Sequence, residues 1–490
     1  MNNNRYGMIF NTLNEIYYYD SGNGKVINCE KKEGELILQI LNGEISLEDA
    51  YAKNPEFYEY VKEEKLFACP EKRDFLFPEK EEFKELVNGA CEQIILELTE
   101  CCNLRCGYCI YHDHHPEFRG FSDKNMDFEV ARKSLDYILR DYKREEFALT
   151  FYGGEPLINF EVMKQTIDYA KLMYPQIQLN ISFTTNLTLL TQHMVDYFKS
   201  LNDYKVSIMC SIDGPKIMHD RFRRDLGGNG SFDRVMAGLN LLLDGFHDEV
   251  GGKTISINCV MAPPYSKVNL ETANNFFYKD LKLSSDIKCN YVYLDQGDMV
   301  FDFNDNEIVV GNDDRMLESC PLEEWAVDNI MKDNDDMEYF DIVSTDMSRI
   351  ASRMCESDVI EKTYLHGNCI PGQRRIYVTV DGEFKVCEKV GSGPSLGDYK
   401  NGYNHDRVYR QYIEEYAEYF KPICNQCWAR PVCAICYERT MNPDGIIQGI
   451  ENKVCEGSRR IIKDLFVNYF RLHEEDSDLL KQALEKYEFS

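Results

Sequence analysis

The sequence lacks any apolar run long enough to cross a membrane, because charged residues interrupt every apolar segment well before the ~20 residues that a transmembrane helix needs. The first residues, 1–5, also lack the apolar core of a secretion signal. No segment repeats at the spacing of a solenoid. We therefore expect a cytoplasmic protein that has no membrane partner and no stacked repeats.

Basic residues are scarce: 55 Lys and Arg stand against 84 Asp and Glu, which gives a formal net charge of −29. Phosphate contacts need a basic surface, so this balance argues against a nucleic-acid partner. The imbalance is strongest between Asp295 and Asp341, where Arg315 and Lys332 are the basic residues. We interpret this sector as a solvated insertion; the alternative is a face that attracts a basic peptide.

The remaining composition, 43% hydrophobic and 28% charged residues in a chain of 490, is typical of a globular protein with two or three domains. The chain has 19 cysteines. Because the cytoplasm is reducing, cysteines in a chain without a secretion signal indicate metal or redox chemistry rather than disulfide bonds.

Three cysteines, Cys102, Cys106 and Cys109, follow an apolar run at 93–99 that we predict to be a buried strand. They therefore lie at the carboxyl end of a strand, where α/β barrels carry their chemistry. Three thiolates on one loop can hold three corners of a [4Fe–4S] cluster and leave one iron open for another ligand. The alternative is half a zinc site with the histidines among residues 112–115, but a fourth ligand at zinc spacing is missing.

From residue 91 onward, strand and helix patterns alternate, which predicts an α/β fold with right-handed crossovers and a parallel sheet. The expected strands are 93–99, 147–152, 178–184, 205–211, 254–261 and 288–294. The expected helices are 128–143, 158–173, 190–201, 232–243 and 268–279.

The cysteine loop, with Tyr108 ahead of its last cysteine, resembles the signature of the radical S-adenosylmethionine (SAM) enzymes. The six strand–helix units resemble the partial (β/α)6 barrel of that family. The resemblance implies that the open iron binds SAM and gives it one electron, supplied by a flavodoxin- or ferredoxin-type donor. SAM then splits into methionine and a 5′-deoxyadenosyl radical, which removes a hydrogen atom from the substrate. The cofactor carries this chemistry, so we assign no acid or base residue.

The loops after the next strands carry further motifs that resemble those of the family. Residues 153–156 (GGEP) resemble the segment that meets the SAM amino group, and residues 184–186 (TTN) resemble the step near the ribose or methionine part. Residues 211–215 (SIDGP) and 219–223 (HDRFR) resemble the S-x-D-G-P and H-D-x-x-R elements. Four such motifs in order, each after a predicted strand, are far more specific than any one of them.

The resemblance implies a set of SAM-binding residues. Ser211 and Arg223 are expected to meet the SAM carboxylate, since an arginine fork pairs with a carboxylate through two hydrogen bonds. Asn258, on the fifth expected strand, is a further candidate. The full set is Tyr108, Gly153, Gly154, Glu155, Thr185, Asn186, Ser211, Asp213, Arg223 and Asn258.

Residues 1–66 are expected to form a first unit of three strands, near 7–10, 16–19 and 25–28, and three helices, which suggests a winged-helix domain. Its position ahead of the core resembles the peptide-recognition element of peptide-maturation enzymes, in which a leader peptide adds a strand to the sheet edge. The alternative is a capping domain without a ligand. Residues 67–90 are expected to be a linker.

Seven cysteines near the C-terminus resemble the SPASM extension, which carries one or two auxiliary [4Fe–4S] clusters. The resemblance assigns four of them to a cluster called auxiliary II: Cys424, Cys427, Cys433 and Cys455. It assigns three to auxiliary I: Cys369, Cys387 and Cys436. The chain departs from the family in the gap before Cys436, which is two residues instead of three, and this departure bears on that cysteine's role.

The fourth ligand of auxiliary I is left open by the sequence. Cys355 or Cys320 folds back onto the site, or the iron stays free for a substrate thiolate, a ligand that soft metal sites prefer. With the cluster on the first loop, the resemblance implies three [4Fe–4S] clusters. The alternative for these cysteines is a structural zinc ribbon.

The expected division of the chain is a recognition element at 1–66, a linker at 67–90, a partial barrel at 91–295, an acidic bridging region at 296–366 and a SPASM domain at 367–490. This combination resembles maturases of ribosomally made peptides. The segment 109–126, with Cys109-Ile110-Tyr111, Phe118-Arg119-Gly120 and Asn125-Met126, most resembles maturases of cysteine-rich peptides. The resemblance implies a thioether between a cysteine sulfur and a carbon of a precursor peptide.

Three alternatives remain open. The same machinery can make a carbon–carbon or another cross-link. A formylglycine-forming sulfatase maturase shares the barrel and the auxiliary clusters but generally lacks the N-terminal unit. A non-catalytic iron–sulfur scaffold or peptide-binding protein has no use for a SAM site, so the intact GGEP motif and cysteine loop argue against it.

Overall fold

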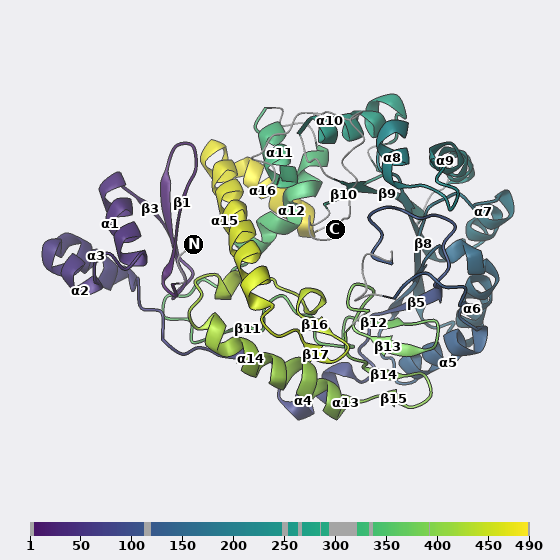
Figure 1. Ribbon diagram of the computed structural model, residues 1–490, viewed down its shortest axis with the longest axis horizontal. Coiled ribbons are helices and arrows are strands. Elements are labelled where there is room, and N and C mark those ends of the chain that lie inside the picture. Colours follow the sequence, from purple (N-terminus) through teal and green to yellow (C-terminus); the bar gives the residue numbers. More distant parts are fainter. Residues whose placement is uncertain are drawn as a thin grey trace.

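The computed structural model describes residues 4–111, 119–246, 253–262, 267–284, 286–293, 321–332, 337–391 and 393–488. Figure 1 shows a small N-terminal unit at one end, a curved parallel sheet at the other end, and the C-terminal part of the chain between them. Within the described residues, no helix is both long enough and apolar enough to span a bilayer.

The N-terminal unit consists of an antiparallel sheet followed by three helices, as predicted. The sheet has the order β1-β2-β3, with bounds β1 (Gly7–Asn11), β2 (Ile16–Asp20) and β3 (Val26–Cys29). The helices are α1 (Lys31–Leu41), α2 (Leu47–Lys53) and α3 (Pro55–Glu64). Ser46 caps α2, since its hydroxyl accepts a hydrogen bond from the backbone N–H of Asp49.

The two faces of this small sheet pack against different parts of the chain. Successive side chains of a strand point to opposite faces, so Tyr18 packs against the helices while Tyr19 points the other way. Tyr19 and Phe10 meet Phe466 of helix α15 (Glu451–Glu475), with ring centroids 4.8 and 5.6 Å apart. The N-terminal unit and the C-terminal part therefore share one apolar core.

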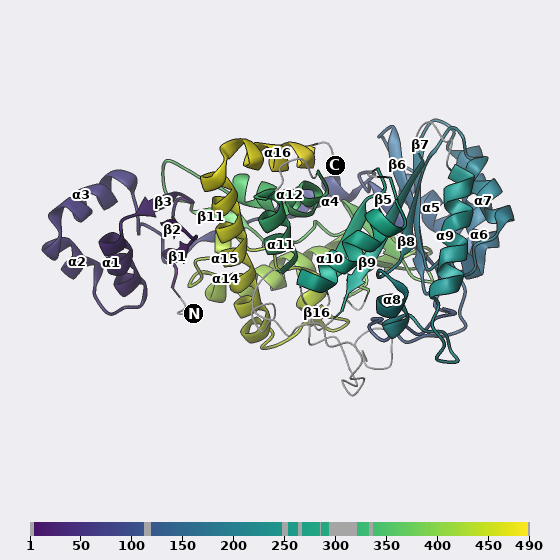
Figure 2. The same ribbon diagram turned by 90° about the horizontal axis from the view of Figure 1, so that it is seen from above.

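Six parallel strands form the barrel, each close to its predicted position. They are β5 (Gln93–Thr99), β6 (Glu146–Gly153), β7 (Gln178–Thr185), β8 (Lys205–Ser211), β9 (Lys253–Met261) and β10 (Cys289–Tyr293). Helices cover the outer face of the strands (Figure 2). The helices between the strands are α5 (Phe128–Leu139), α6 (Phe160–Met173), α7 (Gln192–Lys199), α8 (Lys216–Phe222), α9 (Phe232–Phe246) and α10 (Lys267–Asn275).

The helix ends differ from the predicted ones where local hydrogen bonding decides them. Helix α7 begins after Thr191, because the Thr191 hydroxyl accepts a hydrogen bond from the backbone N–H of Met194. Helix α10 ends at Asn275 and continues as a wider turn, Phe276–Asp280. Helix α8 was not predicted; it is a short helix inside the loop after β8.

The sheet does not stop at the six predicted strands. Strand β12 (Arg375–Val378) pairs in parallel with β5, and β13 (Glu383–Lys385), β14 (Gly397–Asp398) and β15 (Gly402–Tyr403) extend the sheet further, to ten strands. The C-terminal part is therefore joined to the barrel by backbone hydrogen bonds. These strands have two to four residues, too short for hydrophobic alternation to reveal them.

The remaining elements connect and cover these sheets. The segment predicted as a linker contains β4 (Asp74–Leu76), which pairs with β11 (Lys362–Tyr364), and α4 (Lys80–Val87). The others are α11 (Pro321–Ile330), α12 (Met337–Ala351), α13 (His405–Val408), α14 (Glu415–Cys424) and α16 (Ser477–Glu488), with a hairpin of β16 (Met441–Asn442) and β17 (Gly445–Ile446).

We predict that Phe466→Ala loosens the N-terminal unit. The change leaves a cavity between β1, β2 and α15, and such truncations cost about 3 to 5 kcal/mol in a packed core. The N-terminal unit should become sensitive to limited proteolysis at a lower urea concentration than in the unmodified chain. Leu172→Ala is the control, since Leu172 is 76% exposed and should change nothing. Equal protease resistance in both variants would contradict the shared core.

Candidate active site

The three cysteines of the first loop lie together directly after β5. The backbone N–H of Cys109 donates to the carbonyl of Cys106 (3.0 Å), and the N–H of Leu104 donates to the Cys102 sulfur (3.4 Å). Burial raises the pKa of Cys102 to about 12, and the thiolates of Cys106 and Cys109 add to that rise. The three thiols therefore act on one another electrostatically in a desolvated environment. Metal binding here would release protons, because metal ligands are thiolates.

Two glycines hold the loop after β6 against the cysteine loop. Gly153 has φ +135°, and a Cβ at Gly154 would collide with the carbonyl oxygen of Cys101. That close approach allows the N–H of Glu155 to donate to the same carbonyl (3.0 Å), while the N–H of Gly154 donates to Thr99 (2.8 Å). The glycines are needed where the two loops touch.

The carboxylate of Glu155 is buried and binds the next loop. It accepts hydrogen bonds from the Thr185 hydroxyl (2.8 Å), the backbone N–H of Asn186 (2.7 Å) and the backbone N–H of Leu157 (3.2 Å). Burial raises its pKa to about 7, although these donors oppose the rise. Glu155 thus ties the ends of β6 and β7 together, a role that the motif alone does not reveal.

A chain of amide and hydroxyl groups continues from Asn186 to the cysteine loop. Asn186 donates to the side-chain oxygen of Asn103 (2.9 Å), and its amide nitrogen lies 3.9 Å from the Cys102 sulfur. Asn103 donates to the Thr188 hydroxyl (2.7 Å), which donates to Asn186 (2.6 Å). The sequence analysis did not predict Asn103 and Thr188 as site residues. Each is a polar residue close to a predicted motif, since Asn103 follows Cys102 and Thr188 lies two residues after Asn186.

The loop after β8 is organised by the buried carboxylate of Asp213, which is 2% exposed. It accepts hydrogen bonds from the Tyr108 hydroxyl (2.5 Å), from Nε and Nη2 of Arg223 (2.8 and 3.0 Å), and from the backbone N–H of Val260 (2.9 Å). Arg223 is also near Cys106, whose pKa it lowers against the stronger effect of burial. The guanidinium expected to meet SAM is therefore paired with Asp213 beside the cysteines.

Ser211 and Asn258 lie opposite each other on β8 and β9, at the same edge of the sheet. His219, from the same motif as Arg223, holds the loop after β8 through two contacts. Its Nδ1 accepts a hydrogen bond from the backbone N–H of Asp213 (3.3 Å), and its Nε2 lies 3.0 Å from the Ser231 hydroxyl. Burial lowers the pKa of His219 to about 4, so the ring is neutral at pH 7.

The C-terminal cysteines act on one another electrostatically in two sets, Cys424 with Cys427, Cys433 and Cys455, and Cys436 with Cys369 and Cys387. In the first, Cys424 lies at the end of α14 and Cys455 on α15, and the pKa of Cys424 is raised well above its ordinary value by burial and by Cys433, Cys427 and Cys455. In the second, burial raises the pKa of Cys387 to about 12, with Cys436 adding to it. Burial raises the pKa of Cys436, and Cys369 adds to the rise.

The sequence analysis named Cys355 and Cys320 as candidates for a fourth ligand of the second group, and the structure describes only Cys355. Cys355 is exposed, and no described interaction joins it to Cys369, Cys387 or Cys436. Cys320 lies outside the described residues.

Arginines lie near the first of these sets. Arg430 is 2% exposed and acts on Cys424; its Nε donates to the Thr363 hydroxyl (2.8 Å), its Nη1 donates to the side-chain oxygen of Asn425, and Asp74 is a nearby carboxylate. Arg459 places its Nη1 4.0 Å from the Cys427 sulfur. A buried positive charge favours a negatively charged neighbour. A group that carries net negative charge between the thiolates, such as an iron–sulfur cluster, fits this donor set.

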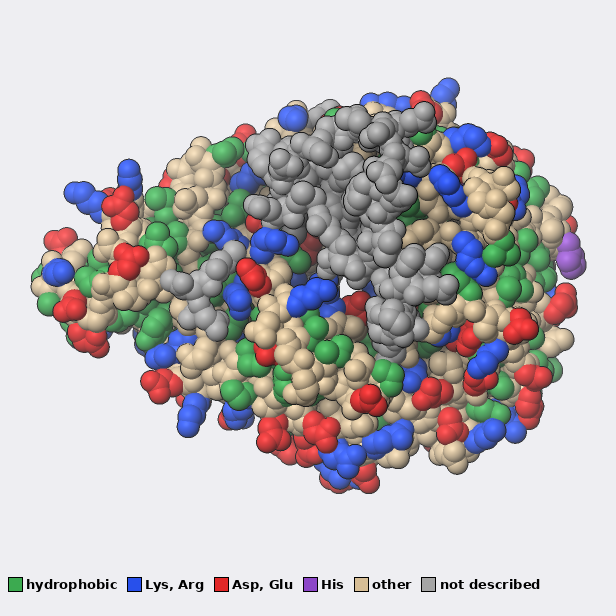
Figure 3. All heavy atoms as spheres, in the orientation of Figure 1, with side chains coloured by type: hydrophobic (Ala, Val, Ile, Leu, Met, Phe, Trp, Pro, Cys, Tyr) green, Lys and Arg blue, Asp and Glu red, His purple; other side chains and the backbone are tan. Residues whose placement is uncertain are grey.

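A second ion pair lies inside the barrel beside the cysteine loop. The buried carboxylate of Glu97 on β5 pairs with Arg119, whose guanidinium lies 3.6 Å from the centre of the Tyr111 ring. Burial raises the pKa of Tyr152 on β6, and the carboxylate of Glu388, the residue that follows Cys387, adds to this rise. Glu388, and with it the segment of Cys387, therefore lies within electrostatic range of a barrel residue. Figure 3 shows an opening near the centre of one face, with basic and acidic side chains at its rim.

Comparisons with known proteins agree with this geometry. Residues 96–275 match the model of the radical SAM superfamily. The chain is 31% identical to a serine-type anaerobic sulfatase-maturating enzyme of Bacteroides thetaiotaomicron over 142 residues, 29% of this chain and 34% of that protein. It is 28% identical to the radical SAM cyclopropyl synthase TigE of Paramaledivibacter caminithermalis over 246 residues, 47% of this chain and 48% of that protein.

A solved structure described as native anSMEcpe with bound AdoMet and Kp18Cys peptide has the same fold. It has a TM-score of 0.52 and 18% sequence identity, and the match covers 78% of this chain and 98% of that one. Residues 96–275 therefore form a radical SAM domain. The matches span about a third to a half of the curated relatives, so the activity, substrates and partners of the whole protein are proposals.

We predict that Gly154→Ala prevents assembly of the first cluster. The added methyl group would displace the loop after β6 from the cysteine loop. Iron content should fall by about 4 atoms per chain, the content of one [4Fe–4S] cluster. Gly120→Ala is the control, because a Cβ at Gly120 meets no atom within 4 Å. Full iron content in Gly154→Ala would show that the loops do not depend on this close approach.

Proposed function

We propose that this radical SAM enzyme is a peptide maturase that links cysteine sulfur to carbon in a ribosomally made precursor peptide. The proposal is supported by three sets of cysteines whose pKa values are raised by burial and by one another, and by the effect of Glu388, next to Cys387, on Tyr152 of the barrel. In a reducing compartment such groups are metal sites. A zinc site is the alternative. It fits this loop less well, because the three cysteines leave one coordination position open and lie beside motifs that resemble those of SAM binding.

Each cofactor has a set of residues in this chain that would hold it. Cys102, Cys106 and Cys109 would hold the cluster that binds SAM, which when bound supplies a 5′-deoxyadenosyl radical that can remove a hydrogen atom. Gly153, Gly154, Glu155, Thr185, Asn186, Ser211 and Asn258 surround the same edge of the sheet and would hold SAM. The remaining members of the predicted set are Tyr108, Asp213 and Arg223.

These last three residues orient the site instead of taking part in the chemistry. The Asp213 carboxylate keeps the Tyr108 ring and the Arg223 guanidinium in fixed positions. Although burial opposes it, Asp213 holds the pKa of Arg223 well above its ordinary value, so the guanidinium stays charged. That positive charge faces Cys106 and would compensate negative charge on the cluster.

The auxiliary sites would supply a place for the substrate thiol. Cys424, Cys427, Cys433 and Cys455 provide four ligands, enough for a closed cluster. Cys369, Cys387 and Cys436 provide three among the described residues, which would leave an iron free for a cysteine of the peptide. A flavodoxin- or ferredoxin-type protein would supply the electron.

The N-terminal unit would bind the leader of the precursor. Its three strands and three helices are consistent with the winged-helix recognition element, and β3 pairs with β2 alone among the described residues. The free edge of β3 could therefore accept an added strand. Strand β1 is the opposite edge of this sheet, and its Phe10 side chain packs on the sheet's face against Phe466 of α15.

A second candidate function is formylglycine formation in a sulfatase. The observation that favours it is the likeness over the barrel to serine-type and cysteine-type sulfatase-maturating enzymes, 31% and 30% identical. The N-terminal unit favours a leader-dependent peptide instead.

We predict that replacing Cys102, Cys106 and Cys109 with Ala abolishes 5′-deoxyadenosine formation. Without the thiolates there is no cluster to reduce SAM. The measurement is chromatography of an anaerobic reaction that contains SAM and dithionite. Cys29→Ala is the control, because Cys29 belongs to the separate core of the N-terminal unit. Continued formation of 5′-deoxyadenosine by the triple variant would sink the radical SAM mechanism.

We predict that a cysteine-rich peptide encoded beside this gene loses two hydrogen atoms per cross-link after anaerobic co-expression with the enzyme. Forming a carbon–sulfur bond removes one hydrogen from the thiol and one from the carbon, so the count of free thiols should fall in step. High-resolution mass spectrometry with thiol alkylation measures both quantities. Co-expression with the triple alanine variant is the control.

Other outcomes decide between the alternatives. The same mass loss with all thiols free would favour a carbon–carbon link. An unchanged peptide in the presence of an enzyme that cleaves SAM would refute the peptide assignment and favour a sulfatase substrate.

A further inference from the structure

One buried histidine contacts a cysteine of auxiliary II directly. The Nε2 atom of His366 lies 3.1 Å from the Cys424 sulfur, within hydrogen-bonding distance. The imidazole ring is enclosed by aromatic rings, with centroids 5.1 Å from Phe420, 5.6 Å from Phe75 and 5.8 Å from Tyr416. Water is therefore kept away from this contact, which strengthens its electrostatic effect on the sulfur.

The other ring nitrogen has its own partner. Nδ1 of His366 lies 3.3 Å from the Tyr416 hydroxyl, which can donate a proton to it. When Nδ1 accepts that hydrogen bond, the ring proton is on Nε2 and points at the sulfur, because the bond made by one nitrogen sets the proton on the other. Tyr416 thus selects the tautomer that donates to Cys424.

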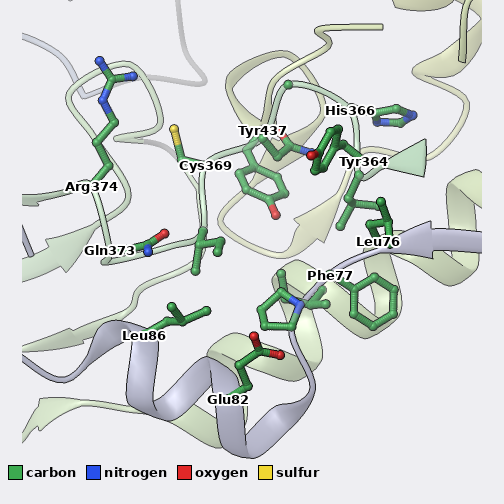
Figure 4. Close-up of a pocket in the computed structure, with 16 residues that line it drawn as sticks. Leu76, Phe77, Glu82, Leu86, Tyr364, His366, Cys369, Gln373, Arg374 and Tyr437 are labelled. Atoms are coloured by element: carbon green, nitrogen blue, oxygen red, sulfur yellow. The ribbon is translucent and has the colours of Figure 1, made fainter. Parts of the chain in front are cut away.

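Tyr416 is also linked, through Thr440, to the backbone of Cys436 in the other cysteine group. The Thr440 hydroxyl lies 3.3 Å from the Tyr416 oxygen and 3.1 Å from the carbonyl of Cys436. His366 also shares a loop with Cys369, and both residues line a pocket of about 740 Å³ (Figure 4). The histidine therefore stands between the two cysteine groups.

We propose that His366 is a positioning residue that raises the reduction potential of the auxiliary II cluster through an Nε2–H···S hydrogen bond to Cys424. This inference rests on the proposed function, because it needs a cluster at Cys424, Cys427, Cys433 and Cys455. A hydrogen bond to a ligating sulfur stabilises the extra negative charge of the reduced cluster. Arg430 acts in the same direction, since its charge interacts with Cys424.

The test isolates this cluster in the full-length chain. Cys102, Cys106 and Cys109 are changed to Ala to remove the SAM-binding cluster, and Cys387→Ala removes auxiliary I. The remaining iron should be about 4 atoms per chain. Its midpoint potential is measured by redox titration followed by electron paramagnetic resonance, a readout that a purely structural role would not move.

In this background, His366→Phe should shift the midpoint potential to a more negative value with the iron content unchanged. His366→Gln, which keeps an N–H donor, should recover part of the shift. Tyr416→Phe should give a smaller shift of the same sign, because the imidazole is then free to adopt the other tautomer. His405→Phe is the control: His405 bonds Asn88 on the surface and should leave the potential unchanged.

An unchanged or more positive potential in His366→Phe at full iron content would overturn the inference alone. If His366→Phe fails to hold iron, Tyr416→Phe decides: a negative shift supports the inference and no shift overturns it. A background protein that binds no iron at all would refute the auxiliary II cluster, and with it both the inference and that part of the proposed function.

Discussion

The carboxylate of Asp213 is surrounded by donors from three parts of the chain, and the geometry of the first cysteine loop depends on it. Tyr108 reaches it from the cysteine loop, Arg223 from the segment after β8, and Val260 from β9. A carboxylate this deeply buried must be fully hydrogen-bonded, since each missing donor costs the desolvation of a charge. The loops are therefore held in one arrangement by the need to compensate a single buried charge.

The same constraint operates with opposite sign near the C-terminus. There the buried group is the guanidinium of Arg430, whose hydrogen bonds go to the neutral side chains of Thr363 and Asn425 and whose nearby carboxylate is Asp74. The thiols of this part add no charge, because burial raises the pKa of Cys455 to about 12 and keeps it protonated. Iron would convert the thiols to thiolates and bring negative charge close to Arg430. Folding of this part and cluster assembly would thus be linked.

The sequence predicted the barrel strands well, because a strand of this kind depends on a short-range pattern. An apolar run such as 93–99 is itself the signal of a buried strand. The partners of the motifs were not predictable in that way. Glu155 binds Thr185, and Asp213 binds Arg223, through contacts that exist only once neighbouring strands are side by side. The motifs located the site, whereas the fold determined which motif residues bind one another.

Strand β12 and His366 mark the limit of sequence reasoning most clearly. Four residues of β12 carry no periodicity, yet their pairing with β5 places Cys387 beside the barrel. His366 is a single histidine with no spacing relation to any cysteine, and 58 positions separate it from Cys424. Because Cys369 lies on the same loop as His366, packing around Cys424 also fixes the wall of the other auxiliary site. One loop therefore carries both the histidine that contacts Cys424 and the cysteine that acts on Cys436.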